Sequence, residues 1–533
     1  MKSILNREFI TEHEKIILLT VSILLIGGIM TIIGIPWCGY HLVDDHEFMA
    51  YTWLRLHDHA TLSQLIKDFI LTDLANGRWR PLYAICRMVF VWVLGTNITL
   101  YHVWSVIRAI IVFILVYAMT RAMRGSILQS YIVALVSLFG YQSAAWWKLG
   151  PQEMTATGLF AAGMCMMIIY LSRNSYPAMV SSMLLFICMG QYKESYILLM
   201  PFVILYAVYH DSTKPEGDVD NAHRRAIRIS HTHLPYLGML CGLLLAELAL
   251  VFRLTRADYL SGSESRFSLR PLYESFLTDL RWFVTAGILL TLLLIIVYGR
   301  HILSLWREII LFAVYMAPQF YLYAPTGITE RYILPASVGF ALFYVLWGPG
   351  VYRSGLTSDR EQNRVRLIVP ISYIYAGILT VLVLIHSSFM ISEGRYYKYR
   401  CDSMSAAWEL IDEQMDLAAS SAVDDPNILS CLYTESGWLI YLHELLGGHD
   451  TTYECSVDYS DYTYTIVPYR YEGLFASGQP EITCDSLDDI DIVVMYNPED
   501  RHYGYDPATL PNFDLTGFTC HKCGTIDTYI RNQ

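Results

Sequence analysis

Long apolar runs separated by short polar stretches dominate the first 395 residues of this chain. Residues 16–36 carry no charge, and about 20 apolar residues are enough to cross a bilayer as a helix. Similar runs recur, so we expect about eleven transmembrane helices in a polytopic α-helical membrane protein. The expected ranges are 16–36, 101–120, 127–147, 153–172, 177–192, 195–210, 234–254, 281–299, 308–324, 332–350 and 367–391.

One apolar segment, residues 81–95, fits this pattern poorly because it is short and contains Arg87. If it crosses the membrane there are twelve spans, and if it lies along the interface there are eleven. Basic residues mark cytoplasmic loops, and only eleven spans place Arg121 and Arg124 in such a loop. We therefore expect the N-terminus in the cytoplasm and the C-terminal tail outside the cell, with the protein in the plasma membrane.

The composition agrees with a membrane protein, because 54% of the residues are hydrophobic and only 16% are charged. Soluble domains carry about 25% charged residues. The net charge is −12, and much of the acid follows residue 400. No basic block suggests a nucleic-acid partner.

The tail, residues 396–533, is expected to form a separate extracytoplasmic domain. Helical spacing at 402–419 and 437–446 and a strand-like run at 490–495 predict a small α/β module. Six cysteines in the tail favour disulfides in an oxidising compartment, with the pairing left open. They are Cys401, Cys431, Cys455, Cys484, Cys520 and Cys523.

An acidic run follows the first apolar segment, with Asp44, Asp45 and Glu47 at the start of the first outer loop, residues 37–100. Carboxylates are costly near hydrocarbon, so they point to a site at the membrane boundary, where one could act as a general base. The same run could instead cap a helix. A divalent cation held by these oxygens is a further alternative, and no other cofactor or metal is expected.

The predicted topology brings other charged residues to the same outer face. They are Arg78 and Arg80, Glu153, Lys193 and Glu194, and Arg331 followed by Tyr332. Arginine and lysine bind phosphate and stabilise its developing charge, and apolar grooves between helices can hold a lipid tail. These parts suit group transfer from a lipid-linked phosphate.

Four motifs in this order resemble the GT-C superfamily of integral-membrane glycosyltransferases, which includes protein O-mannosyltransferases and aminoarabinose transferases. The motifs are Asp44-Asp45 in the first outer loop, Arg80-Pro81-Leu82 followed by His102, Lys193-Glu194 followed by Pro201, and Arg331-Tyr332-Ile333-Leu334-Pro335. The resemblance covers roughly residues 10–395, and the tail resembles no family.

The resemblance implies a polyprenyl-phosphate sugar donor, a glycan, lipid or protein acceptor, and inversion at the anomeric carbon. It makes Asp44 or Asp45 the base, and the choice between them stays open. Lys193 and Arg331 would hold the donor phosphate with help from Arg78 or Arg80, and Glu153 would be a second acidic residue. Glu194, His102 and Tyr332 would support these groups.

Two other functions remain as alternatives. A transporter or flippase of lipid-linked sugars should show internal repeats or charges at mid-bilayer, and the sequence shows neither. A non-catalytic membrane scaffold that presents the tail would leave the outer-face charges without a role.

Overall fold

The structure is a computed structural model that describes most of the helical part of the chain and the strands of its tail. The described residues are 13–41, 46–56, 58–212, 230–254, 269–299, 305–324, 326–349, 362–421, 426–431, 452–458, 463–468, 487, 490–497 and 514–532.

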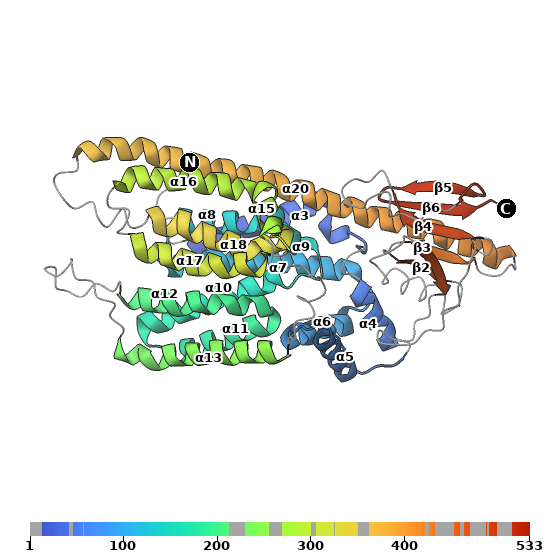
Figure 1. Ribbon diagram of the computed structural model, residues 1–533, viewed down its shortest axis with the longest axis horizontal. Coiled ribbons are helices and arrows are strands. Elements are labelled where there is room, and N and C mark those ends of the chain that lie inside the picture. The colour runs from blue at the N-terminus through green and yellow to red at the C-terminus, as the bar shows by residue number, and fades with distance from the viewer. Residues whose placement is uncertain are drawn as a thin grey trace.

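Most helices lie side by side along the long axis of the molecule, and a β-sheet sits at one end of this bundle (Figure 1). Large buried aliphatic and aromatic side chains form one core through the bundle. Its helices are α2 (Glu14–Ser22), α3 (Gly28–Ile33), α7 (Ile98–Ala122), α8 (Ile127–Leu138), α9 (Ala144–Trp147), α10 (Glu153–Arg173), α11 (Tyr176–Tyr192), α12 (Met200–Ser212), α13 (Leu234–Leu254), α16 (Arg281–Tyr298), α17 (Trp306–Leu322), α18 (Ile333–Ala341) and α20 (Gln362–Ser421).

Within the described residues, six helical stretches are long and apolar enough to cross a membrane, or seven if the bent pair α8 and α9 counts as one. The six are Glu14–Ile33, Ile98–Ala122, Glu153–Arg173, His231–Leu254, Arg281–Tyr298 and Ile371–Ala418. These stretches agree with a helical membrane protein, but the expected number of eleven is not reached. The shortfall has a physical reason, because α11 and α17 have only 17 residues each and α12 only 13.

Three helices of the first outer loop gather at the end of the bundle that carries the sheet (Figure 1). They are α4 (His46–Leu56), α5 (Leu62–Ala75) and α6 (Pro81–Leu94). Pro81 starts α6, where its missing N–H costs nothing. With 14 residues, α6 is about 21 Å long, too short to cross about 30 Å of hydrocarbon.

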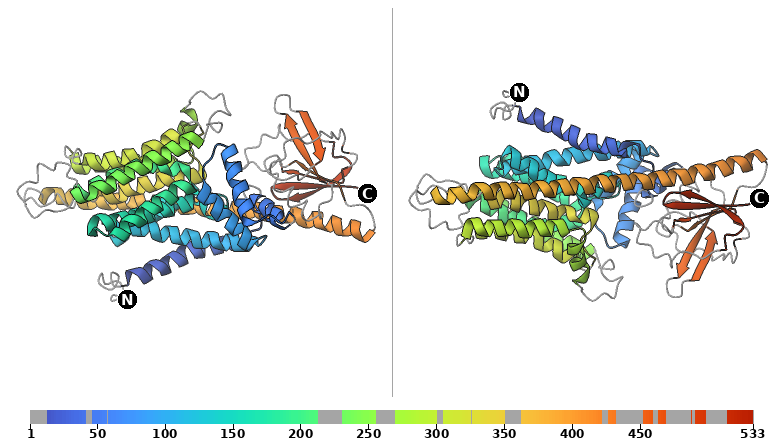
Figure 2. Two further views of the ribbon diagram at one scale, coloured as in Figure 1. Left: turned by 90° about the horizontal axis from the view of Figure 1, so that it is seen from below. Right: turned by 90° about the horizontal axis from the view of Figure 1, so that it is seen from above.

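Helix α2, the first described helix, begins away from the sheet (Figure 2). The bundle is connected to the sheet by α20, a helix of 60 residues. It is about 90 Å long and runs along the bundle and on to the sheet (Figure 2). The expected domain boundary at residue 396 therefore falls inside one continuous helix.

The tail contains a six-stranded mixed sheet, in agreement with the expected small α/β module. The strand order is β3-β2-β1-β4-β6-β5, with β1 parallel to β2 and β4 and the other pairs antiparallel. The expected strand at 490–495 is β4, and the expected helix at 437–446 lies outside the described residues. The strands are β1 (Ile428–Cys431), β2 (Thr452–Asp458), β3 (Thr463–Pro468), β4 (Ile492–Tyr496), β5 (Phe518–Cys523) and β6 (Ile526–Arg531).

The cysteines at positions 520 and 523 cannot form a disulfide with each other. Both lie on β5, three residues apart, so they point to opposite faces about 10 Å apart along the strand. A disulfide needs Cα atoms within about 7 Å. None of the eight cysteines whose side chains the structure describes forms a disulfide with another of them. The expected disulfides therefore stay a prediction that concerns Cys431, Cys455 and Cys484, whose side chains lie outside the described part.

The end of α20 packs on the sheet through Met404, Ala407 and Ile411, which meet Ile428 of β1 and Ile526 of β6. This apolar contact fixes the helix to the tail.

We expect Ile411→Ala to lower the free energy of unfolding of the tail by about 2–5 kcal/mol, because Ile411 is only 2% exposed. Pulse proteolysis in urea on the full-length protein measures this loss. Leu417→Ala on the same helix, at a side chain that is 50% exposed, should change little. Equal effects of the two substitutions would contradict this packing.

Candidate functional site

Three of the predicted site residues meet at the end of the bundle next to the sheet. Glu153 is the first residue of α10, and Lys193 is the extended residue between α11 and the 3-10 helix η4 (Glu194–Leu199). Arg331 lies in the 3-10 helix η8 (Glu330–Tyr332), directly before α18. Helix ends far apart in sequence thus build one site.

The centre of this site is an ion pair between Lys193 and Glu153. Lys193 Nζ lies 3.2 Å from Glu153 Oε1 and 3.2 Å from Gln152 Oε1. The side chains are 12% and 1% exposed, respectively. An ammonium group has three N–H donors, so one remains for a ligand after these two contacts.

The turn that carries Lys193 also fixes the start of α10. Tyr196 donates a hydrogen bond of 3.0 Å to the backbone carbonyl of Glu153, and its hydroxyl lies 2.7 Å from that of Thr157. Glu153 is thus held beneath Lys193, almost without solvent contact. This placement suits a carboxylate that positions Lys193, and a catalytic role for Glu153 stays a prediction.

A second ion pair stands beside the first. Lys148 Nζ lies 2.6 Å from Glu330 Oε2. The next residue, Arg331, has its guanidinium 5.3 Å from the centre of the Tyr332 ring, and Lys193 Nζ is 5.9 Å from the same ring. The Tyr332 ring therefore has a cation contact from both predicted phosphate-binding residues, within the range of cation–π attraction.

One of the positive charges that act on Glu330 belongs to α20. Burial raises the pKa of Glu330, but the positive charges of Lys148, Arg331 and Arg400 outweigh burial and hold this pKa below its ordinary value. Arg400 belongs to α20 and is nearly buried. Glu330 also has a positive φ of 41°, a rare backbone conformation for a residue other than glycine that often marks functional segments.

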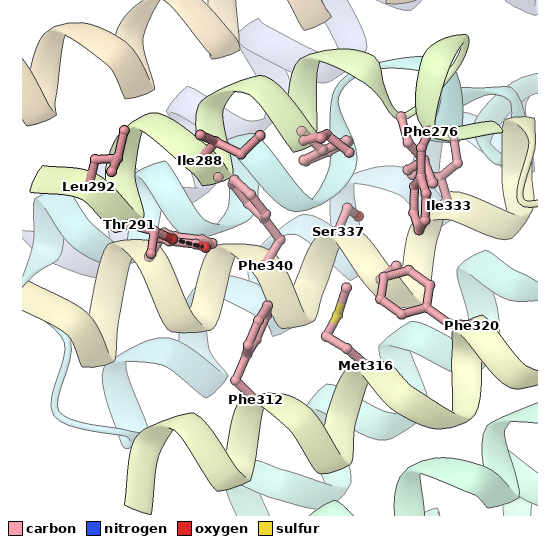
Figure 3. A pocket seen from close by; sticks show the side chains of 16 residues that line it. Phe276, Ile288, Thr291, Leu292, Phe312, Met316, Phe320, Ile333, Ser337 and Phe340 are labelled. Atoms are coloured by element: carbon pink, nitrogen blue, oxygen red, sulfur yellow. Dashed lines mark hydrogen bonds between the residues drawn. The ribbon is translucent and has the colours of Figure 1, made fainter. Parts of the chain in front are cut away.

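An apolar cavity of about 370 Å³ lies between α16, α17 and α18, and Ile333, two residues after Arg331, is one of its lining residues (Figure 3). Ile333 lines it near Phe276 of helix α15 (Arg270–Leu277), and Thr291 and Leu292 lie at its other end. Its walls come from α15, α16, α17 and α18 and are largely aromatic and aliphatic. Since Ile333 follows Arg331 by two residues, cationic and apolar surfaces are adjacent here.

The structure places the two predicted arginines of the first outer loop in contacts of that loop. Arg80 is buried and Arg80 Nε donates to Asp73 Oδ2 over 3.1 Å. The backbone N–H of Arg78 donates to the carbonyl of Asp73. The role of these two arginines at the donor phosphate stays a prediction.

The first outer loop nevertheless docks on the site. The Tyr83 hydroxyl of α6 donates a hydrogen bond of 3.0 Å to the carbonyl of Gly150, three residues before Glu153. The rings of Tyr83 and Tyr192 lie 5.5 Å apart. Helix α6 is thereby held against the two turns that carry the ion pair.

The chain leading to the acidic run is held by two helices. His102 Nε2 of α7 lies 3.2 Å from the carbonyl oxygen of Gly39, and the His41 ring stacks on Tyr397 of α20 at 4.5 Å. Asp44 and Asp45 lie outside the described residues, and so does the side chain of Glu47. The predicted supporting role of His102 is consistent with its contact to this segment.

Glu194 starts η4 beside Lys193 and is partly buried. Among the described residues, no group of three histidine, cysteine, aspartate or glutamate side chains could hold a metal ion. A divalent cation at Asp44, Asp45 and Glu47 concerns side chains outside that part of the chain and stays an open alternative.

Sequence reasoning did not assign Lys148, Gln152, Glu330 and Arg400 to the site. Lys148 and Glu330 are charged residues in short outer turns, and this signal could have included them. Arg400 carried no such signal, because it belongs to the helix that enters the tail.

No model of a known protein family matches this chain, and no curated protein matches it. The resemblance to the GT-C superfamily therefore depends on the motifs alone.

We expect Lys193→Met to destabilise the protein by about 3–5 kcal/mol, because it leaves the buried Glu153 carboxylate without its partner. The double variant Lys193→Met with Glu153→Leu should recover most of this loss. Chemical unfolding in detergent measures both values. Lys148→Met, at a half-exposed ion pair, should cost less than about 1 kcal/mol. If the double variant is as unstable as Lys193→Met alone, Lys193 does not stabilise the protein through its ion pair with Glu153.

The lowered pKa of Glu330 predicts a pH-dependent contribution to stability. Its carboxylate stabilises the fold above its ordinary pKa of 4.5, and this contribution is lost as the pH falls through the lowered value in the folded protein. Glu330→Gln should therefore lower the thermal midpoint at pH 7 by a small amount, equivalent to less than about 1 kcal/mol. This effect should fade as the pH falls below 4.5 and through the lowered pKa of the folded protein. The exposed Glu409→Gln should show no such difference at either pH.

Proposed function

We propose that this protein is a membrane glycosyltransferase that moves a sugar from a polyprenyl-phosphate donor to an acceptor at the sheet end of the bundle. One observation carries the proposal, namely that Ile333, two residues after Arg331, lines the 370 Å³ apolar cavity. A lipid-linked phosphate has the same two parts in the same order, a charged head and a long apolar tail.

The donor phosphate would bind between Arg331 and Lys193. A guanidinium offers paired N–H donors that match phosphate oxygens, and Lys193 retains one donor after its two contacts. The first isoprene units would enter the cavity past Ile333 and contact Phe276, Phe320 and Phe340. Rigid aromatic walls suit a branched, unsaturated chain.

The chemistry would be a single displacement. Asp44 or Asp45 takes the proton from an acceptor hydroxyl, and the hydroxyl oxygen attacks the anomeric carbon on the side opposite the phosphate. The bond between that carbon and the phosphate oxygen breaks, and the anomeric configuration inverts. Positive charge at Arg331 and Lys193 stabilises the departing phosphate. Chain connectivity alone keeps Asp44 within about 11 Å of His41.

We further propose that the N-terminus is cytoplasmic and that the sheet lies outside the plasma membrane. Arg121 and Arg173, the basic residues in the last turns of α7 and α10, support this orientation. The acceptor would then be a glycan, lipid or protein on the outer face.

A donor panel tests the proposal on purified protein in nanodiscs. Wild type should bind and consume at least one radiolabelled polyprenyl-phosphate sugar. Arg331→Ala should weaken donor binding at least tenfold, whereas Asp44→Asn or Asp45→Asn should abolish turnover while binding remains. Arg253→Ala, at an exposed arginine of α13, is the matched control and should change neither.

The cavity gives a separate readout. Ala336→Phe should fill part of it and weaken the binding of a long-chain donor more than that of a short-chain analogue with the same head group.

Full activity of both aspartate variants would remove the general-base role. No donor bound by wild type would reject the transferase proposal.

A further inference from the structure

A second charged pocket lies next to the first site, between α6 and α7. Arg108 is in the middle of α7, one of the helices long and apolar enough to span a membrane. Its Nη2 donates to Ser105 Oγ over 3.0 Å and to the carbonyl of Ala145 over 3.4 Å, and its Nε is buried without a partner. Within the described part of the chain no carboxylate forms an ion pair with it. A charged group in such a helix marks a functional site by default, because its burial is costly.

Arg108 lines a small pocket together with a second arginine. Arg87 of α6 is nearly buried, donates from Nη1 to the Tyr83 hydroxyl and lies 4.1 Å from the centre of the Phe48 ring. Tyr101, Ser105 and Tyr192 complete the polar lining. The pocket has a volume of about 30 Å³, which is room for about two water-sized atoms.

The pocket therefore fits part of an anionic group rather than a whole ligand. The two guanidinium groups offer the hydrogen-bond donors, because the hydroxyls of Tyr83 and Tyr101 already donate to the carbonyls of Gly150 and Gly95. Guanidinium groups bind phosphate oxygens in pairs. Among the described residues, Glu153 is the one carboxylate whose charge acts on Arg108. Glu153 is already paired with Lys193.

The surface beside the pocket is apolar and exposed. Phe90 and Trp104 form its rim, and Val93, Leu100 and Ile107 on α6 and α7 are large hydrophobic side chains on the outside of the bundle. A tryptophan at such a rim is typical of the membrane–water interface. The acyl chains attached to an anionic headgroup in the pocket would thus lie along α6 and α7.

We propose that this pocket binds the anionic phosphate headgroup of a membrane lipid, with the acyl chains on the exposed face of α6 and α7. It shares no lining residue with the cavity between α15 and α18. The lipid proposal does not rest on the glycosyltransferase proposal, although Tyr83, Leu149 and Tyr192 of this pocket adjoin the turns that carry Gly150 and Lys193.

Native mass spectrometry of the full-length protein tests the proposal. The protein is released from detergent after equilibration with an equimolar mixture of phosphatidylglycerol and phosphatidylcholine. Wild type should retain one more phosphatidylglycerol molecule than Arg108→Gln, and Arg108→Lys should show intermediate retention because it keeps the charge and loses the paired donors. The matched control is Arg253→Gln, at an exposed arginine of α13, and it should retain as much as wild type.

A second variant separates ligand loss from misfolding. Leu149→Phe places a larger side chain at the pocket wall, keeps both arginines and should also lose the extra phosphatidylglycerol. Equal retention by wild type, Arg108→Gln and Leu149→Phe would overturn the proposal. Displacement of the lipid by millimolar inorganic phosphate would also overturn it, because the site would then recognise a free anion and not a lipid.

Discussion

The burial of the Glu153 carboxylate beneath Lys193 is the interaction on which the arrangement of the bundle end depends. An apolar bundle tolerates such a charge only with a partner close by, so the start of α10 and the end of α11 must meet. Tyr196 and Tyr83 then fix η4 and α6 to the same place through hydrogen bonds to Glu153 and Gly150. Arg331 and Tyr332 complete this junction from the start of α18.

The same constraint explains why cationic and apolar surfaces are adjacent. Helices of a membrane bundle keep their charges at their ends, where water is near, and their apolar side chains along their length. At the start of α18 this change takes place within three residues, from Arg331 to Ile333. A site of this kind favours a ligand that is itself amphiphilic, whichever reaction it supports.

The long helix α20 connects the bundle to the tail without a break. It contributes Tyr397 and Arg400 near the site and, little more than one turn later, the apolar residues that pack on the sheet. A ligand at the bundle end and a partner at the sheet would therefore act on one rigid element. In this way the tail is part of the architecture of the site and not only an appended domain.

The sequence by itself determined the helical membrane character, the strand at β4 and the grouping of Glu153, Lys193 and Arg331, because apolar periodicity and charges at helix ends are local patterns. It did not determine the number of membrane-length helices, since α11 and α17 have only 17 residues each and α12 begins at Met200, later than the expected start at 195, and has only 13. It also did not show that Arg80 contacts Asp73, that Arg400 acts on Glu330 or that Cys520 and Cys523 face opposite ways. Those features were decided by tertiary structure, because each depends on which distant or oppositely facing groups the packed chain brings within a few ångströms.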